Sequence, residues 1–296
     1  MIEFKKMKIS VVINTFDEEK NILRAITSVK DFANEIVVCD MFSEDKTVEI
    51  AKKLGAKIIT HKKTDFVEPA RNFAVEQATG DWIFVLDADE EISVDLANQL
   101  KQLAQEDKTD YVSLPRKNII FGKWMEHSRW WPDYLVRFFK KGKVVWSDRI
   151  HQPPETSGKE FKLDAIEQNA IIHYNYNTLD QYLERMVRYS RIQSVQLQEN
   201  GYNFNWCDLI RKPTSEFLSR YFAGEGYKDG LHGFCLALLQ SLSEFLVYIR
   251  VWESQKFKEV EEAEIVNEVN KAANEADFWL VQKSNNPFKK ILHKLR

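Results

Sequence analysis

The chain has 296 residues, of which 44% are hydrophobic and 29% charged, and its formal net charge is −3. This length is enough to bury a full core, as one large domain or as one domain with an appendage. The charge does not support nucleic-acid binding, and three widely spaced cysteines show neither a disulfide framework nor metal spacing, which favours a reducing cytosol.

Strand and helix patterns alternate over the first third of the chain. Short apolar runs predict strands, and apolar residues at helical spacing between them predict helices. The expected strands are Ile9–Asn14, Glu35–Asp40, Lys57–Thr60 and Trp82–Leu86, and the expected helices are Ile22–Val29, Thr47–Leu54 and Val67–Ala78. Asp17 is a candidate N-cap for the first helix. This alternation predicts right-handed βαβ units and a parallel sheet, which binds ligands beyond the carboxyl ends of its strands.

The middle of the chain predicts further strands, and the C-terminal part predicts helices. The strands are Tyr111–Leu114, Leu135–Phe139, Val144–Trp146 and Ala170–Tyr174. Thr178 then opens a long helix as part of a capping box with Gln181, and Gly201 ends it. From about Asp208 onward the pattern is helical throughout.

The first strand is not followed by a glycine-rich loop, since no glycine occurs before Gly55. This excludes a dinucleotide fingerprint or a P-loop there, so a bound nucleotide would need side chains and a metal to balance its charge. Asp87 and Asp89 follow an apolar strand and offer the oxygen ligands that Mg²⁺ or Mn²⁺ prefers. A solvated acidic turn before the helix at Ser93 is the alternative interpretation.

Two further residues are placed for chemistry at the same edge. Asp40 ends the second strand, where it is either a ligand-binding carboxylate or a turn aspartate. Arg71 lies in the motif Pro69-Ala70-Arg71-Asn72, where it either pairs with phosphate or base or is a surface residue of a helix.

Four sequence blocks together resemble family 2 glycosyltransferases with the GT-A fold. They are Val11–Glu19, Glu35–Asp40, Ala70–Asn72 and Gly80–Glu90. The downstream blocks resemble the branch that includes lipopolysaccharide core β-glucosyltransferases. They are Trp131–Tyr134, Arg137–Phe139, Asp148–His151, Ile172–Tyr174 and Tyr227–Gly230, and the resemblance covers about residues 7–250.

The resemblance implies an α/β fold of the GT-A type, with a Rossmann-like, mostly parallel sheet flanked by helices. It also implies inverting transfer of a hexose, glucose in the related branch, from a nucleoside diphosphate sugar such as a UDP-sugar to a lipopolysaccharide core or other cell-envelope saccharide. By analogy, Thr15 and Asp40 would contact the base, Asp87 the ribose, and Asp89 the metal. A late histidine completes the metal shell in several such enzymes, and His173 is the candidate here.

Inversion requires a base that takes the proton of the acceptor hydroxyl. The related branch usually carries His-Glu where this chain has His151-Gln152, and glutamine cannot act as a base. Asp148, His151 and Asp133 are the remaining candidates, and each of them also has a structural interpretation.

The C-terminal part predicts contact with a membrane surface or with a second subunit. Leu231–Ile249 is apolar but interrupted by polar residues, so it is expected to be a buried or interfacial helix rather than a membrane span. The last residues place Phe288, Ile291, Leu292 and Leu295 on one helical face, with basic residues on the others; packing on its own domain is the alternative.

We therefore expect a glycosyltransferase domain over residues 1–207 and a helical region over residues 208–296. The expected location is the cytoplasm, with peripheral contact at the inner face of the cytoplasmic membrane. No apolar signal-peptide region follows the N-terminus. A sugar nucleotidyltransferase is one alternative function, but such an enzyme would need a glycine-rich loop after the first strand. A non-catalytic scaffold that binds nucleotide sugars is the second alternative.

Overall fold

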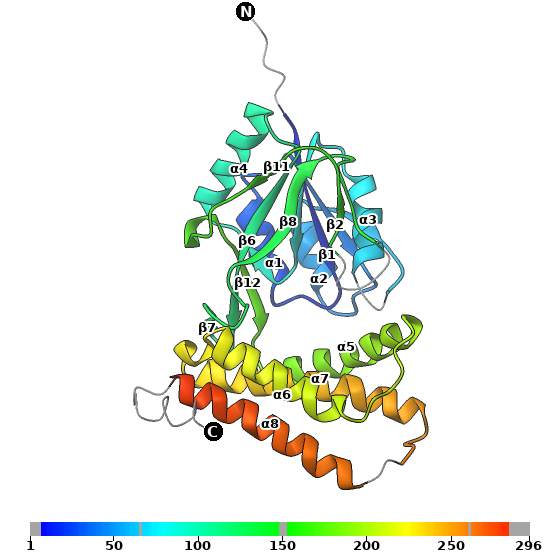
Figure 1. The fold of residues 1–296 in the computed structure, drawn as a ribbon. Helices are drawn as coiled ribbons and strands as arrows, with labels where there is room; N and C mark the ends of the chain where they lie inside the picture. Colours follow the sequence, from blue (N-terminus) through cyan, green and yellow to red (C-terminus); the bar gives the residue numbers. More distant parts are fainter. Residues whose placement is uncertain (1–6, 65–66, 148–152, 260–261, 284–296) are drawn as a thin grey trace, which may run out of the picture. The chain divides into compact units, whose positions relative to one another are not determined.

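The computed structural model describes residues 7–64, 67–147, 153–259 and 262–283 (Figure 1). The chain forms two compact units. One, the sheet unit, comprises residues 1–119 and 132–175, and the other, the helical unit, comprises residues 120–131 and 176–296. The division expected from the sequence, into a glycosyltransferase domain over residues 1–207 and a helical region over residues 208–296, stays a prediction.

The sheet unit is built around a mixed sheet whose first four strands are parallel. The strands run in the order β3-β2-β1-β4-β8-β6-β12-β5, and β8 is antiparallel to both β4 and β6. The bounds are β1 Ile9–Thr15, β2 Glu35–Asp40, β3 Lys57–Thr60, β4 Trp82–Asp87, β5 Glu90–Glu91, β6 Tyr111–Ile120, β8 Asp133–Lys140, β11 Glu160–Lys162 and β12 Ile171–Tyr176. β11 pairs with β6, and β9 (Val144–Val145) and β10 (Glu155–Thr156) form a small separate sheet.

Helices cover both faces of this sheet (Figure 1). They are α1 Ile22–Val29, α2 Thr47–Lys53, α3 Glu68–Gln77 and α4 Val94–Glu106, and a 3₁₀ turn, η1, spans Glu167–Asn169. On one face Val11 and Ile13 of β1 pack with α1 and α4, and on the other face Val12 packs with α3. Alternate residues of this buried strand thus belong to two cores, which is why Val11, Val12 and Ile13 are all apolar. The prediction of an α/β fold with a mostly parallel sheet flanked by helices is confirmed.

Of the two helix caps predicted from the sequence, the one at Thr178 is confirmed and the one at Asp17 is wrong. Ser93 caps α4 by accepting a hydrogen bond from the Leu96 amide, and Thr178 caps α5 in the same way through the Gln181 amide. Asp17 does not cap α1, so that prediction is wrong. Its backbone is left-handed, with φ of 53°, and its carboxylate accepts from the Glu44 amide, so it shapes the loop and leaves Asn21 at the N-cap position.

The described residues of the helical unit form four α-helices. They are α5 Leu179–Glu199, α6 Asp208–Leu218, α7 Leu231–Ser254 and α8 Glu262–Lys283, with a π-helical turn η2 over Ser219–Ala223, a 3₁₀ turn η3 over Gly226–Asp229, and the short strand β7 Lys123–Trp124. Its buried centre is formed by Ile120, Met125, Tyr182, Met186 and Leu236.

α7 is more exposed than a core helix of this length would be. Among the described residues it is the one helix long and apolar enough to cross a membrane by length and composition alone. Of its most apolar stretch, 28% is buried inside the structure. A single helix of this kind is weak evidence for a membrane span, but it does leave an apolar surface to be explained. The amphipathic segment predicted at residues 286–296 lies outside the described residues.

Candidate active site

The carboxyl ends of β1, β2 and β4 bring the predicted donor residues together. The parallel register places Thr15 beside Asp40 and Asn14 beside Asp87, so these side chains occupy one edge of the sheet. The Asp40 carboxylate accepts hydrogen bonds from the backbone amides of Phe42 and Ser43, at 3.1 and 3.2 Å. Asp40 therefore also builds the turn that follows its own strand.

Asp87 lies between two buried arginines. Its Oδ1 is 2.7 Å from Arg71 Nη2, and its Oδ2 is 2.5 Å from Arg137 Nη2. Burial alone would raise the pKa of Asp87, but the charges of Arg137 and Arg71 outweigh it and hold that pKa well below its ordinary value. Asp87 is thus a permanent carboxylate whose negative charge is already matched by arginine.

The ion-pair cluster continues from Arg137 to the neighbouring strands. Glu90 is fully buried, with its Oε1 3.2 Å from Arg116 Nη1 and 3.7 Å from Arg137 Nη2. Asp133 Oδ2 accepts from Nε and Nη2 of Arg116, at 2.9 and 2.7 Å. Burial alone would lower the pKa of Arg116, but Asp133 and Glu90 raise it above its ordinary value. Three carboxylates therefore balance three arginines.

Asp89 faces a histidine instead. Its Oδ2 is 3.5 Å from His173 Nε2, and both residues are buried. His173 lies in β12 beside Glu90 of β5, and its Nδ1 is 2.7 Å from Asn118 Oδ1. Because the amide oxygen can only accept, Nδ1 donates this hydrogen bond, and Nε2 is the ring nitrogen that faces Asp89.

The carboxylate of Asp89 and the Nε2 atom of His173 are both suitable ligands for a divalent cation. An amide oxygen that fixes the tautomer of a histidine is a common support for a metal ligand. Within the described residues, however, no group of three or more His, Cys, Asp or Glu side chains could hold a metal ion by itself. An ion bound here would need further oxygen atoms from a ligand, as Mg²⁺ usually takes from substrate phosphates.

Several residues of this site were not predicted as site residues from the sequence. Arg116 and Asn118 lay in no sequence block, whereas Glu90 and Arg137 were visible only as members of the blocks Gly80–Glu90 and Arg137–Phe139. Asn72 also acquires a role, since its side-chain amide pairs with both backbone groups of Trp146, at 2.9 and 2.7 Å. It thereby anchors the chain just before residues 148–152, and the base candidates Asp148 and His151 lie outside the described residues.

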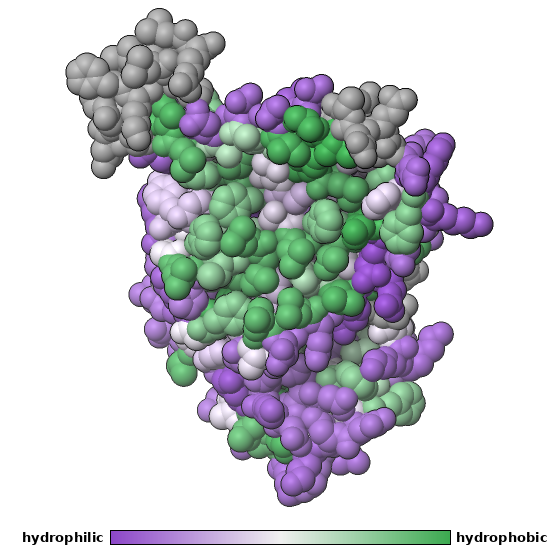
Figure 2. All heavy atoms as spheres, turned by 90° about the horizontal axis from the view of Figure 1, so that it is seen from below, coloured by the Kyte–Doolittle hydropathy of each residue, from purple (hydrophilic) through white to green (hydrophobic). Residues whose placement is uncertain are grey.

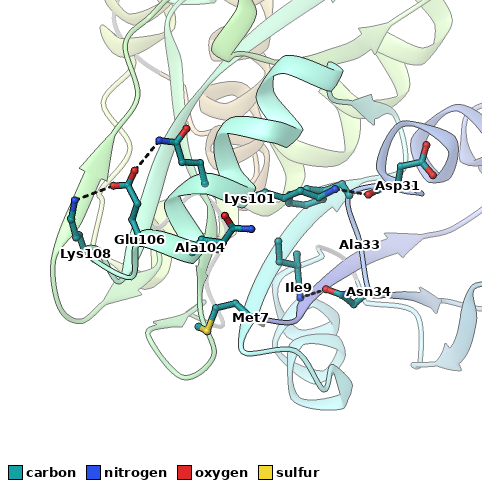
Figure 3. A pocket seen from close by; sticks show the side chains of 12 residues that line it. Met7, Ile9, Asp31, Ala33, Asn34, Lys101, Ala104, Glu106 and Lys108 are labelled. Carbon is teal, nitrogen blue, oxygen red and sulfur yellow. Dashed lines mark hydrogen bonds and ion pairs between the residues drawn. The ribbon is translucent and has the colours of Figure 1, made fainter. Parts of the chain in front are cut away.

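A separate hollow of about 880 Å³ lies at the opposite edge of the sheet (Figure 3). Its lining includes Met7 and Ile9, at the amino end of β1, and Lys101 of α4. The Lys101 ammonium donates to the backbone carbonyl of Asp31 across it, at 2.6 Å. None of the predicted donor or metal residues lines this hollow, so the sheet edge with Asp87 and Asp89 remains the candidate site.

Comparison with known proteins identifies the family of the chain. The family model described as glycosyl transferase family 2 matches residues 10–159, about half of the chain and most of the sheet unit. The chain belongs to glycosyltransferase family 2. The GT-A fold and the glycosyltransferase activity expected from the sequence are thereby confirmed.

Relatives of this family 2 glycosyltransferase include an uncharacterized glycosyltransferase of Rickettsia typhi. That protein is 29% identical over 252 residues, which cover 81% of this chain and 85% of the relative. Glycosyltransferase SunS of Bacillus subtilis is 28% identical over 181 residues, covering 60% of this chain and 42% of SunS. Among solved structures, S. aureus TarS 1-349 in complex with UDP has a TM-score of 0.46 at 15% identity, covering 86% of this chain and 95% of that one.

Proposed function

We propose that this enzyme transfers a hexose, with inversion, from a UDP-sugar to a lipid-linked saccharide of the cell envelope, and that Mg²⁺ or Mn²⁺ assists donor binding. Glucose as the sugar and the lipopolysaccharide core as the acceptor follow the resemblance of the blocks Trp131–Tyr134, Ile172–Tyr174 and Tyr227–Gly230. In this proposal residues 1–207 form the transferase domain, and residues 208–296 form a helical region for membrane or subunit contact.

The observation that carries the donor site is a set of buried polar atoms without partners. Among the described residues, Thr15 Oγ1, Arg71 Nε and Arg137 Nε are buried and have no hydrogen-bond partner. A buried polar group left unpaired costs about 1–3 kcal/mol, so several such groups at one sheet edge suggest that a ligand supplies the missing partners. A nucleoside diphosphate offers acceptors of this kind.

Each residue of the edge then has a proposed task. Thr15 and Asp40 would contact the base, and Asp87 the ribose, oriented by its two arginines. Arg71 and Arg137 would donate hydrogen bonds to the diphosphate from their unpartnered Nε–H groups. Asp89 and His173 would hold the metal ion, which neutralises charge that develops on the departing diphosphate. Asp87, the second candidate metal ligand of the sequence, is better explained as the partner of Arg71 and Arg137.

The donor proposal predicts metal-dependent binding of uridine nucleotides. By calorimetry, we expect a UDP-sugar to bind with Mn²⁺ present and to bind at least about tenfold more weakly without it, which is about 1.4 kcal/mol. Mn²⁺ alone should bind weakly, because the described side chains provide an incomplete ligand set. Tighter binding of guanosine or thymidine diphosphate sugars would overturn the uridine assignment.

A second prediction concerns the catalytic base. Asp133 is held by Arg116, which suits an orienting role, so we expect the base to be Asp148 or His151. Replacing the base should lower the transfer rate about 10²–10⁴-fold with donor affinity unchanged. Single-turnover rates of Asp148→Asn and His151→Ala test this. If neither variant slows transfer more than a few-fold, Asp133→Asn becomes the next variant to measure.

A further inference from the structure

An apolar stripe runs along the first half of α7 on the surface of the helical unit. Leu231, Phe234, Leu238 and Leu242 are spaced three or four residues apart, so they share one helical face. These residues are 74%, 38%, 46% and 42% exposed. No charged residue occurs from Leu231 to Ser243. The view of the helical unit in Figure 2 shows a continuous hydrophobic area bordered by hydrophilic residues.

Phe234 joins this stripe to an apolar pocket of about 440 Å³ between α6, η2, α7 and α8. The pocket walls include Phe217, Tyr221, Ala276 and Leu280. The π-helical turn η2 supplies Tyr221, and a turn of this kind is rare and is often found at functional sites. The volume is within the range of small-molecule sites, and the aromatic and aliphatic lining suits a hydrocarbon chain.

Positive charge begins at the border of this pocket. Leu280 lines the pocket, and Lys283, at the end of the same helix, donates to the hydroxyl of Tyr227 at 3.2 Å. The Tyr227 ring in turn packs against Tyr221 of the pocket wall. From Phe278 to Arg296 the sequence contains five lysine or arginine residues and no acidic residue. An apolar face on a chain whose C-terminal sequence is basic is the pattern of a protein that binds an anionic membrane surface.

We propose that this α7 face, with its pocket, binds the surface of an anionic phospholipid bilayer and that the pocket receives one acyl chain. The inference deepens the proposed function, because it names the surface on which the enzyme meets a lipid-linked acceptor. The apolar stripe supplies hydrocarbon contact and the basic segment supplies attraction to acidic headgroups. Neither is strong alone, and stable membrane binding generally takes two such signals.

Flotation of the full-length protein with vesicles tests the proposal. We expect recovery with vesicles of phosphatidylglycerol and phosphatidylethanolamine and much lower recovery with phosphatidylcholine. The double variant Leu238→Lys/Leu242→Lys should lower the affinity by about tenfold per leucine, or about 1.4 kcal/mol each, since burial of a leucine favours binding by at least that amount. Ala276→Trp, which fills the pocket, should weaken binding to the same vesicles.

Val94→Lys is the matched control, because Val94 is an exposed apolar residue on α4 of the sheet unit. It should bind vesicles as the unaltered protein does, and circular dichroism should show that every variant is folded. Equal flotation of the double leucine variant and the unaltered protein would overturn the proposal. The proposal would also be overturned if the unaltered protein did not bind vesicles but formed a dimer that the leucine substitutions dissociate. That result would identify a second copy of the chain as the partner of the α7 face. Unchanged affinity of Ala276→Trp would overturn the acyl chain in the pocket.

Calorimetry with a UDP-sugar separates this inference from the proposed function. The leucine variants should bind the donor normally, since neither leucine belongs to the donor site. Loss of vesicle binding with donor binding intact is the expected result. An absence of donor binding in the unaltered protein would instead refute the proposed function and leave the membrane result standing.

Discussion

Replacement of Asp89 by asparagine should lower the rate of sugar transfer about 10³-fold, equivalent to about 4 kcal/mol. Asparagine keeps the shape of the side chain but removes the charge that would hold a cation beside His173, 3.5 Å away. Donor binding should lose its dependence on Mn²⁺, so calorimetric titrations with and without the ion should coincide. Turnover of a UDP-sugar at saturating Mn²⁺ measures the rate.

Asp95→Asn is the control for this substitution. Asp95 is an exposed carboxylate in the first turn of α4, so its loss removes the same charge without touching the sheet edge. It should leave the rate within about twofold, as expected for a surface change. An Asp89→Asn enzyme with unaltered turnover would exclude a metal role for this residue, whatever the metal dependence of the unaltered enzyme.

The predicted strands β1 to β4 agree closely with the structure because their signals are local. Each is a short β-branched or aromatic run between polar turns, and Gly55 ends the helix before β3 in a left-handed conformation. The carboxyl-edge position of Asp40 and Asp87 follows directly once the strands are parallel. These features depend on residues close together in the chain, so a single sequence is sufficient to predict them.

The ion-pair cluster depended on strand register and was therefore not predictable. Arg116 meets Asp133 because β6 pairs with β8 in antiparallel register, with a bulge between Val112 and Ser113. Arg137 reaches Asp87 because β8 also pairs with β4. No turn motif in the sequence specifies either register, and a shift of one residue would turn these side chains to the opposite face. For the same reason the Asn118–His173 contact was not expected.

Replacement of Arg137 by methionine should destabilise the sheet unit by about 3–5 kcal/mol, the usual result when one partner of a buried ion pair is removed. Methionine keeps much of the apolar volume but leaves Glu90 with one arginine fewer and Asp87 with Arg71 alone. The exposed Arg191→Met on α5 is the control and should cost no more than about 0.5 kcal/mol. Urea unfolding followed by circular dichroism measures both.

The pH dependence of this loss gives a sharper test of its cause. The pKa of Asp87 is lowered in the folded protein, so its contribution to stability is present above its unfolded pKa of about 3.9 and is lost as the pH falls toward the folded pKa. Without Arg137 the folded pKa of Asp87 should rise. The loss of unfolding free energy caused by Arg137→Met should therefore be largest near neutral pH and should become smaller below about pH 4. Adding Glu90→Gln should recover part of the loss, because it restores the charge balance. The contrary result is a loss of unfolding free energy that is independent of pH and unchanged by Glu90→Gln. That result would show that Arg137 stabilises the sheet by packing and not by charge.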